Sequence, residues 1–440
     1  MGGGGSTSGE PVVLLHAPGS EKMAAAICDA LGPGACSSAV YSQSKPDSGA
    51  TPADAALCWE RFPSDDPNIK LRISEIRDRH VVLLFDMFDR HAESELLSLL
   101  LFVQGFRVPR PLEAHARAKW KQTETEGEFD VCSASKVTVL VPWYRYGSME
   151  RTCRWAWREG GWDNGVADGE YVDVPTATTF LALLSCAPAC LPPRGRVPKQ
   201  IVFVDLHEYA PVEATLRAGG GWVNRPTAYD LESGSGTYFT SAIDVFLRTQ
   251  YRPALADASL GFVVFPDAGA HRRFAAMVAR HGLPPSNVLW IEKTRVGTAI
   301  TQSAELRYID GSGEATMGGK FPVGARIMII DDFTNSGSTL FGCAAILRPR
   351  IGGPTTVGAF VSHLVAGYRR EKVRAIVDQL YAEDCPLDTL VTTDSNATVA
   401  TWLEEELANR PAPPKASLMP IAPLLATWLR ASALASDAKL

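Results

Sequence analysis

From Val12 onwards, short runs of apolar residues alternate with longer segments in which apolar residues recur every three or four positions. The short runs are typical of buried strands, and the longer period is typical of helices packed on a sheet. This alternation predicts an α/β fold with mainly parallel sheets. The predicted strands are 11–15, 80–85, 136–141, 200–205, 261–265, 287–291, 325–330, 356–361 and 389–392, and the predicted helices are 92–104, 176–187, 237–249, 270–281, 339–347 and 368–381.

The same alternation occurs in both halves of the chain, although we find no obvious sequence repeat between them. A chain of 440 residues accommodates two to three domains. The pattern therefore predicts two tandem α/β domains, each with a sheet flanked by helices. The predicted divisions are a flexible Gly-rich leader at 1–10, a first domain at 11–235 with insertions at 109–131 and 154–173, a second domain at 236–405, and a Pro-rich linker with a C-terminal helix at 406–440.

The second insertion contains Trp155, Trp157 and Trp162 among arginine, glutamate and glycine residues. Three tryptophans in eight residues could stack on a ligand, but a packed surface insertion is the simpler interpretation.

Composition excludes several classes of function. The net charge of −6 and the absence of a Lys/Arg-rich stripe argue against a nucleic-acid surface. No run of 18 apolar residues occurs, so no transmembrane segment is expected. The nine cysteines are scattered without paired spacing, which favours reduced thiols and a cytoplasmic location over a disulfide framework.

The segment 327–339 carries the clearest chemical signal. Four apolar residues lead into Asp331 and Asp332, and a polar loop follows before the predicted helix. A Ser- and Gly-rich loop at a helix N-terminus can hold a phosphate through backbone N–H groups, and adjacent carboxylates can hold sugar hydroxyls or Mg²⁺. The alternative is that these residues only cap a turn. The spacing favours a site for a sugar phosphate.

Three other predicted strands also end in polar residues. His207 follows one strand and Asp267 precedes a Gly turn after another, at the edge where α/β sheets bind ligands. Lys293 and Arg295, two residues apart after a third strand, can reach one anionic centre and steady a moving phosphoryl group. Taken singly, capping or solvated salt bridges would explain these residues. The stretch 296–320 is predicted to form a mobile flap.

Segment 327–339 resembles the PRPP-binding loop of type I phosphoribosyltransferases and ribose-phosphate pyrophosphokinases (PRPP synthetases). In order and spacing, Asp205-Leu206-His207, Pro266-Asp267-Ala268-Gly269, Lys293-Thr294-Arg295 and the loop resemble the PRPP synthetase pattern. Segments 62–68 and 142–151 are similar to the ATP segments of that family, closest to the plant-type class II form. Ser362-His363 and 392–395 fit its closing strands, and the resemblance covers about residues 60–400.

The resemblance implies two phosphoribosyltransferase-like domains, Mg²⁺ as cofactor, and ATP and ribose 5-phosphate as substrates. It also implies a homo-oligomer or a hetero-oligomer with related subunits. The implied roles are transition-state stabilisation by Lys293 and Arg295, Mg²⁺ binding by His207 and Asp267, ribose 5-phosphate binding by Asp331, Asp332, Asn335, Ser336, Gly337, Ser338 and Thr339, and ATP binding by Phe62, Asp65, Asn68, Met149, Glu150 and Arg151.

Three hypotheses follow. The first is an active ribose-phosphate diphosphokinase that makes PRPP and AMP. The second is a catalytically silent PRPP synthetase-like subunit with a regulatory or structural role, because the nucleotide segments depart from the family pattern: Ser64 replaces an aspartate, and a Trp-rich insertion follows the second segment. The third is a phosphoribosyltransferase that uses PRPP, which two domains and the Lys-x-Arg segment disfavour.

Overall fold

The computed structural model of the protein describes residues 11–437 except 39, 43–54, 65, 89, 110–128, 148–153, 159–160, 165–170, 185–196, 210–222, 225–235, 256, 297–298, 310–314 and 318. The chain forms two compact units. The first contains Met1–Phe203, Glu208–Phe239 and Leu425–Leu440, and the second contains Val204–His207 and Thr240–Leu424. The four residues Val204–His207 thus belong to the second unit, although the segments before and after them belong to the first.

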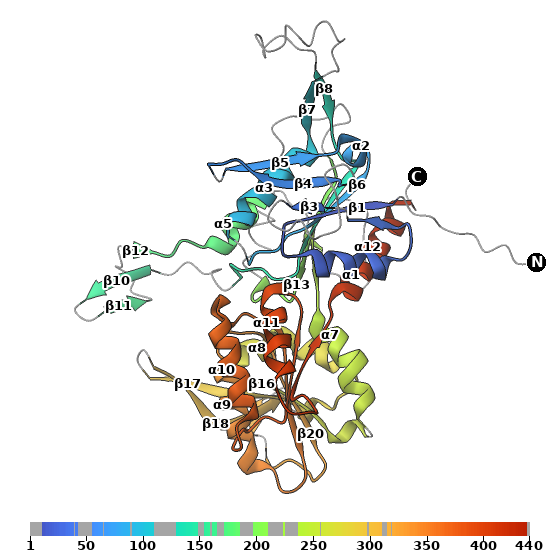
Figure 1. Ribbon diagram of the computed structural model, residues 1–440. Helices are drawn as coiled ribbons and strands as arrows, with labels where there is room; N and C mark the ends of the chain where they lie inside the picture. The colour runs from blue at the N-terminus through green and yellow to red at the C-terminus, as the bar shows by residue number, and fades with distance from the viewer. Residues whose placement is uncertain are drawn as a thin grey trace, which may run out of the picture. The chain divides into compact units, whose positions relative to one another are not determined.

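The first unit is built on a seven-stranded sheet (Figure 1). The neighbouring pairs β1/β2, β1/β6, β6/β9, β9/β13 and β14/β15 are all parallel. Strands β1 and β6 are buried along their whole length, as expected for the centre of a parallel sheet. In sheet order the strands are β14 (Val223–Asn224), β15 (Gly236–Thr240), β13 (Lys199–Val204), β9 (Lys136–Val141), β6 (His80–Leu84), β1 (Val12–His16) and β2 (Cys36–Ser37).

Helices and small antiparallel sheets complete this unit. Its described helices are α1 (Glu21–Leu31), α2 (Ile73–Ile76), α3 (Arg90–Gln104), α5 (Thr176–Leu184) and most of α12 (Ala422–Asp437). The small sheets are β3 (Val40–Ser42), β4 (Leu57–Arg61) and β5 (Pro67–Leu71); β7 (Phe106–Pro109) and β8 (Phe129–Cys132); and β10 (Arg154–Arg158), β11 (Gly161–Asn164) and β12 (Tyr171–Val172). The last of these is the Trp-rich insertion, in which the Trp157 side chain is exposed.

The C-terminal helix α12 is held to the first unit by a buried chain of polar side chains. Lys136 Nζ in β9 donates to Ser432 Oγ at 2.7 Å, and Ser432 Oγ donates to Gln200 Oε1 in β13 at 2.7 Å. Burial lowers the pKa of Lys136 to about 8. Trp428 of the same helix lies against Tyr238, with ring centroids 5.2 Å apart. The helix therefore belongs to the core of this unit.

Replacing Ser432 with alanine is expected to lower the free energy of unfolding by about 1–3 kcal/mol, because Gln200 loses a buried hydrogen-bond donor and Lys136 loses an acceptor. Urea unfolding measures the change. The matched control is Ser98→Ala in α3, where the exposed hydroxyl donates only along its own helix to the Ser94 carbonyl. That change is expected to stay within about 0.5 kcal/mol. Equal losses in the two variants would contradict the role given to Ser432.

The second unit is built on an eight-stranded sheet in the order β19-β18-β17-β16-β20-β21-β22-β23. From β17 to β23 the neighbours are parallel, and β18 and β19 extend one edge as antiparallel strands. The bounds are β16 (Gly261–Phe265), β17 (Val288–Val296), β18 (Ala299–Ile309), β19 (Ala315–Met317), β20 (Arg326–Thr334), β21 (Thr356–Leu364), β22 (Thr389–Thr393) and β23 (Ala416–Met419).

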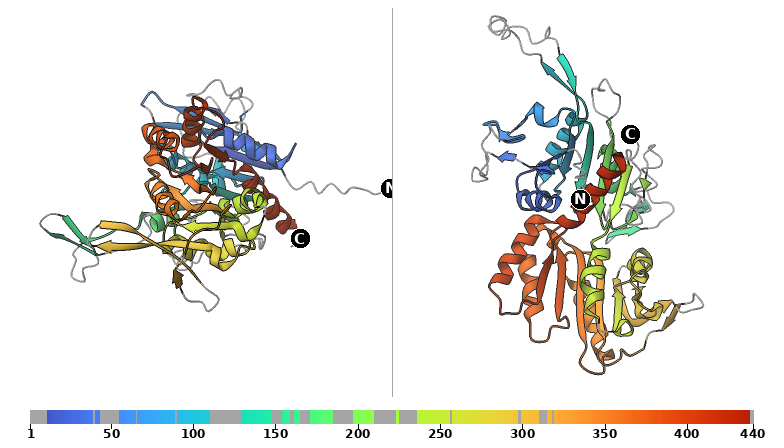
Figure 2. Two further views of the ribbon diagram at one scale, coloured as in Figure 1. Left: turned by 90° about the horizontal axis from the view of Figure 1, so that it is seen from below. Right: turned by 90° about the vertical axis from the view of Figure 1, so that its right-hand side faces the viewer.

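Helices cover both faces of this sheet, as the right-hand view of Figure 2 shows. They are α7 (Ala242–Phe246), which continues as a π-helical turn at Leu247–Tyr251, α8 (Ala268–Ala279), α9 (Ser338–Leu347), α10 (Arg370–Tyr381) and α11 (Ala397–Ala408). The chain moves from β16 through α8 to β17 on one side, but from β20 through α9 to β21 on the other. The direction of winding therefore reverses between β16 and β20.

The nine predicted strands are all present, with ends displaced by a few residues. Three expectations differ more. The predicted helix 237–249 begins as strand β15 and becomes helical only at Ala242, because Ser241 caps that helix. The tail predicted as a linker and helix supplies strand β23 as well as α12. Predicted strand 325–330 continues to Thr334, so Asp331 and Asp332 lie within β20.

The cysteines depart from the sequence-based expectation at one place. Cys28 at the end of α1 and Cys36 in β2 form a disulfide, which their spacing did not predict. Cys58, Cys132, Cys343 and Cys385 are thiols that form no disulfide, and the other three cysteines lie outside the described residues. In the part of the chain that the structure describes, no helix is long and apolar enough to cross a membrane.

Candidate active site

The predicted carboxylates lie where the winding of the second sheet reverses. Asp267 follows β16, and Asp331 and Asp332 lie in the C-terminal part of β20, beyond the last residues that pair with β16. In open α/β sheets, ligands bind at the carboxyl ends of the strands at such a switch point. The topology therefore places these three side chains at the position where a ligand is expected.

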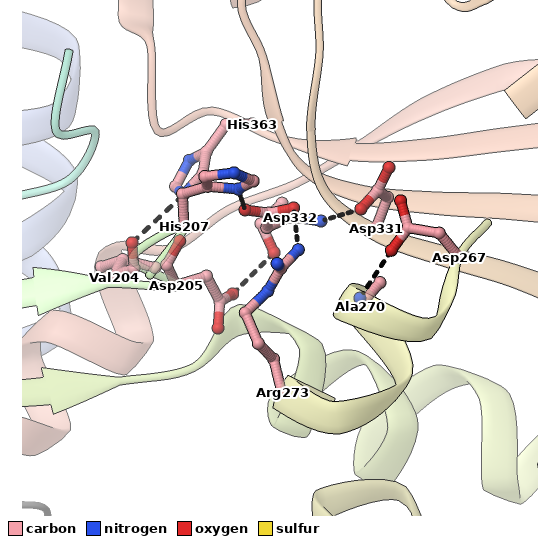
Figure 3. Close-up of polar contacts among 10 residues, drawn as sticks. Val204, Asp205, His207, Asp267, Ala270, Arg273, Asp331, Asp332 and His363 are labelled. Carbon is pink, nitrogen blue, oxygen red and sulfur yellow. Dashed lines mark hydrogen bonds and ion pairs between the residues drawn. The ribbon is translucent and has the colours of Figure 1, made fainter. Parts of the chain in front are cut away.

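Asp332 is the centre of the polar contacts in this region (Figure 3). Its Oδ2 lies 2.6 Å from Nδ1 of His207, and its Oδ1 accepts from Nη2 of Arg273 at 3.2 Å. Only 2% of the Asp332 side chain is exposed, against 25% of His207 and 13% of Arg273. His207 and Arg273 thus enclose a carboxylate that is almost entirely withdrawn from water.

The pKa values of the two adjacent carboxyls, Asp331 and Asp332, are shifted in opposite directions. Burial alone would raise the pKa of Asp332, but the hydrogen bond and charge of His207 and the guanidinium of Arg273 outweigh burial and lower that pKa to about 2. Burial, followed by the negative charge of Asp332, raises the pKa of Asp331 well above its ordinary value. Asp332 is therefore the permanently ionised member. Because an ionised carboxylate only accepts hydrogen bonds, Nδ1 of His207 must carry a proton and donate the hydrogen bond.

Arg273 has no signal in the linear sequence. It lies in the second turn of α8, and helix geometry brings its guanidinium to Asp332, 59 residues further along the chain. Its Nε is buried without a hydrogen-bond partner in the described structure. A basic residue one and a half turns after the Asp267 cap would have been the only clue.

The side chains at this edge that would hold a magnesium ion are Asp267 and His207. Asp267 caps α8 by accepting from the Ala270 N–H at 2.8 Å, and its charge acts on Asp331. The fixed Nδ1–H tautomer of His207 leaves Nε2 as the nitrogen for a ligand bond, the arrangement usual in metal-binding histidines. No group of three or more His, Cys, Asp or Glu side chains suited to a metal is found among the described residues. Two protein ligands fit Mg²⁺, which commonly completes its shell with water and substrate phosphates.

The loop predicted to bind phosphate lies between the end of β20 and the first residues of α9. Asn335 and Ser336 are exposed between β20 and α9, and Gly337, the residue before the helix, has φ 75°, a left-handed conformation that favours glycine. The Gly337 N–H donates to Thr334 Oγ1 at 3.0 Å, and Ser336 Oγ donates to Ser338 Oγ at 3.0 Å. Helix α9 has no capping side chain at Gly337, and its Ser338 N–H donates to Ser336 Oγ at 3.4 Å. Its N-terminal N–H groups are thus arranged for an external anion.

Asn335 and Thr339 lie at opposite ends of this loop. The Asn335 side chain accepts from the Gly367 N–H at 3.3 Å, which joins the loop to the turn after β21. Thr339 is the second residue of α9 and is partly exposed.

The segment that carries His207 is anchored by residues that sequence reasoning left without a role. The Asp205 carboxylate accepts from the N–H groups of Ala242 and Ile243 at 2.8 and 3.2 Å and from Ser362 Oγ at 2.6 Å. Its burial raises the pKa of Asp205 to about 6. His363 Nε2 lies 3.1 Å from the Val204 carbonyl and 3.3 Å from that of Asp205.

Burial lowers the pKa of His363 to about 4, against about 6.5 in an unfolded chain. A lowered histidine pKa contributes stability that is complete above pH 6.5 and is lost as the pH falls towards 4, because the unfolded chain takes up the proton first. Between pH 7 and pH 5 the wild type should therefore lose about 2 kcal/mol more than His363→Gln, whose amide does not titrate. Urea unfolding of both proteins at the two pH values tests this. Identical pH dependence would show that His363 does not contribute.

Lys293 and Arg295 lie in β17, and their backbones pair with Gln302 and Ile300 of β18. The register is irregular between Ile291 and Lys293. The side chains of Lys293 and Arg295 lie outside the described part of the structure, so their role stays a prediction. The stretch predicted as a flap begins at the end of β17 and contains β18 and β19, which extend the sheet edge.

The predicted ATP segments belong to the first unit. Phe62 follows β4 with half of its side chain exposed, and its N–H donates to the Asp66 carbonyl at 2.9 Å. Asn68 in β5 donates to Glu60 Oε2 at 3.3 Å. Ser64 Oγ donates to Asp66 Oδ2 at 2.6 Å. Asp65, Met149, Glu150 and Arg151 lie outside the described residues.

Almost the whole chain is similar in fold to a solved structure. It is similar to the crystal structure of phosphoribosylpyrophosphate synthetase from Mycobacterium smegmatis, with a TM-score of 0.53, 17% sequence identity, and coverage of 96% of this chain and 98% of that chain. The fold is that of a PRPP synthetase. The predicted fold class, two mainly parallel α/β units flanked by helices, is therefore confirmed. No protein-family model and no curated protein sequence matches the chain.

Proposed function

We propose that the protein is a ribose-phosphate diphosphokinase that transfers the β,γ-pyrophosphoryl group of ATP to the 1-hydroxyl of ribose 5-phosphate. One observation carries the proposal. His207, from a tetrapeptide inside the first half of the chain, meets Asp332 at 2.6 Å beside Arg273, Asp267 and a phosphate-type loop. A metal ligand, a cation and an acceptor loop at one sheet edge are the parts that pyrophosphoryl transfer to a sugar phosphate needs.

The loop and the carboxylates suit the acceptor substrate, ribose 5-phosphate. The N–H groups at the start of α9 and the Ser336 and Ser338 hydroxyls would bind the 5-phosphate, together with Asn335 and Thr339. Asp331 would hold ribose hydroxyls and so orient the 1-hydroxyl, and Asp332, predicted for the same role, would hold His207 and Arg273 in place with its two oxygens. In the reaction, the ribose 1-oxygen bonds to the β-phosphorus, the bond from that phosphorus to the α–β bridging oxygen breaks, AMP leaves, and the hydroxyl proton is released.

The residues around Asp332 suit ATP, the donor of the pyrophosphoryl group. His207 and Asp267 would hold Mg²⁺, which neutralises triphosphate charge when bound. Arg273 would add a fixed positive charge at the same edge, and Lys293 and Arg295 would stabilise the negative charge on the transferred group. Phe62, Asp65, Asn68 and Met149–Arg151 would bind ATP. The exposed Phe62 ring is suited to stacking on a base. A cytoplasmic location and an oligomer of identical or related subunits complete the proposal.

The test is incubation with ATP, Mg²⁺ and ribose 5-phosphate, with AMP and PRPP measured together. Equal amounts of both products are expected in the wild type, and Lys293→Ala and Arg295→Ala should lose most of the activity while still binding ribose 5-phosphate. Arg280→Ala is the control, since this arginine lies at the end of α8 with 58% of its side chain exposed. Absence of AMP and PRPP despite ribose 5-phosphate binding would reject the proposal.

That last outcome would favour a second candidate, a catalytically silent subunit of an assembly of PRPP synthetase-like chains. The observation behind it is in the nucleotide segment, where the Ser64 hydroxyl engages the Asp66 carboxylate. An acidic side chain committed to a neighbour in this way is less available to a nucleotide or its metal ion.

A further inference from the structure

The tetrapeptide Val204–His207 reaches the second unit without being part of its sheet. The segments on both sides of it belong to the first unit. Asp205 has φ 39°, a left-handed conformation that is unfavourable for a residue other than glycine. A strained residue persists only where its surroundings hold it firmly. Something must therefore fasten this segment to the second unit.

The Asp205 side chain supplies the first anchor. It is 1% exposed, and one oxygen, Oδ2, receives the N–H groups at the start of α7 and the hydroxyl of Ser362. The other oxygen is buried without a partner in the described structure. A buried carboxylate with this arrangement is costly to keep, which argues that it serves the position of the backbone around it.

His363 supplies the second anchor. It is also 1% exposed, and its Nε2 faces the carbonyls of both Val204 and Asp205. Because carbonyls only accept, Nε2 carries the proton, and Nδ1 accepts from Ser395 Oγ at 2.8 Å. Ser395 precedes the Asn396 cap of α11, so the histidine is oriented by a helix start. A single imidazole N–H thus holds the backbone two to three residues before His207.

We infer that His363 and Asp205 are positioning residues that fix His207 against Asp332, and through it set the geometry of the divalent-cation site. The part of the inference that concerns the cation rests on the proposed function, whereas the part that concerns the His207–Asp332 contact does not. The imidazole itself is held by the hydrogen bond to Asp332 and by an edge contact with the Phe333 ring, and the two anchors fix the backbone that precedes it. Outer contacts of this kind commonly change metal affinity by about 10–100-fold.

The first test measures Mn²⁺ binding to the full-length protein by electron paramagnetic resonance. His363→Leu is expected to weaken binding by about 10–100-fold. His363→Gln should restore most of the affinity, because its amide N–H has nearly the reach of Nε2. His80→Leu is the matched control: His80 is buried in the first unit and hydrogen-bonded to Thr138 Oγ1 at 2.9 Å. It should lower stability and leave Mn²⁺ affinity unchanged. Wild-type affinity in folded His363→Leu would overturn the inference.

The second test needs no metal. Nuclear magnetic resonance of protein labelled with ¹⁵N-histidine reports the ring tautomers, and His207→Ala identifies the His207 signal. The wild type and His363→Gln should show the Nδ1–H form of His207, and His363→Leu should lose it. Persistence of that form in His363→Leu overturns the inference. If wild-type Mn²⁺ binding does not depend on His207, the proposed cation role fails, while the tautomer result still decides whether His363 positions His207.

Discussion

Replacing Asp332 with asparagine is expected to lower kcat/KM for PRPP formation by about 10³-fold and the free energy of unfolding by about 3–5 kcal/mol. Asparagine keeps the shape but has only one acceptor oxygen. Its NH₂ group would face either the Nδ1–H of His207 or the guanidinium of Arg273, both of which now donate to a carboxylate. Breaking a buried ion pair on one side leaves the remaining charge uncompensated, which is why the stability loss is large. Steady-state kinetics and urea unfolding measure the two effects.

The neighbouring residue provides the matched control. Because burial and the charge of Asp332 raise the pKa of Asp331, the uncharged amide of Asp331→Asn resembles the form that the environment favours. This variant should change stability by no more than about 1 kcal/mol, although it should still weaken ribose 5-phosphate binding. Equal loss of stability in the two variants would contradict the assigned ionisation, whatever reaction the protein catalyses.

Replacing Gly337 with alanine is expected to weaken ribose 5-phosphate binding by about 10–100-fold, measured by titration calorimetry. Two effects combine. At φ 75° a side chain costs about 1–2 kcal/mol, and a Cβ would lie 2.7 Å from Cε2 of the buried Phe341 ring. Relief of this clash has to move either the phenylalanine or the loop. Movement of the loop displaces the N–H groups at the start of α9 that are expected to bind the phosphate.

Gly324 separates the two effects. It has φ 80° in the turn before β20, and a Cβ there would meet nothing within 4 Å. Gly324→Ala should therefore show the backbone cost alone, without loss of ribose 5-phosphate affinity. Gly337→Ala combined with Phe341→Leu should recover part of the affinity, because the smaller side chain makes room while the backbone cost remains. If the double variant binds no better than the single one, the contact with Phe341 is not the cause.

The strands and the motifs that follow them can be predicted from the sequence because, in parallel sheets, the polar residues of a site lie next to strand ends. A buried apolar run followed by a polar turn is a local signal, so β16, β20 and β21 and the residues after the first two could be located from their own segments. The loop 335–339 was recognisable for the same reason. The apolar residues at the start of 237–249 fit the period of a strand as well as that of a helix, and the cap at Ser241 decides where the helix begins.

Tertiary structure alone decided which side chains meet and which carboxyl is ionised. His207 contacts Asp332 across 125 residues of chain, and His363 contacts Val204 across 159. Arg273 and Asp205 became site residues only when helix α8 and strand β21 were placed around them. Acidity depends on burial and on neighbouring charges, so Asp331 and Asp332, adjacent and identical in sequence, acquire opposite pKa shifts. The sequence by itself determined where the candidate functional groups lie along the chain, because strand ends are local; folding determined their partners and charges, because these arise from residues distant in the chain.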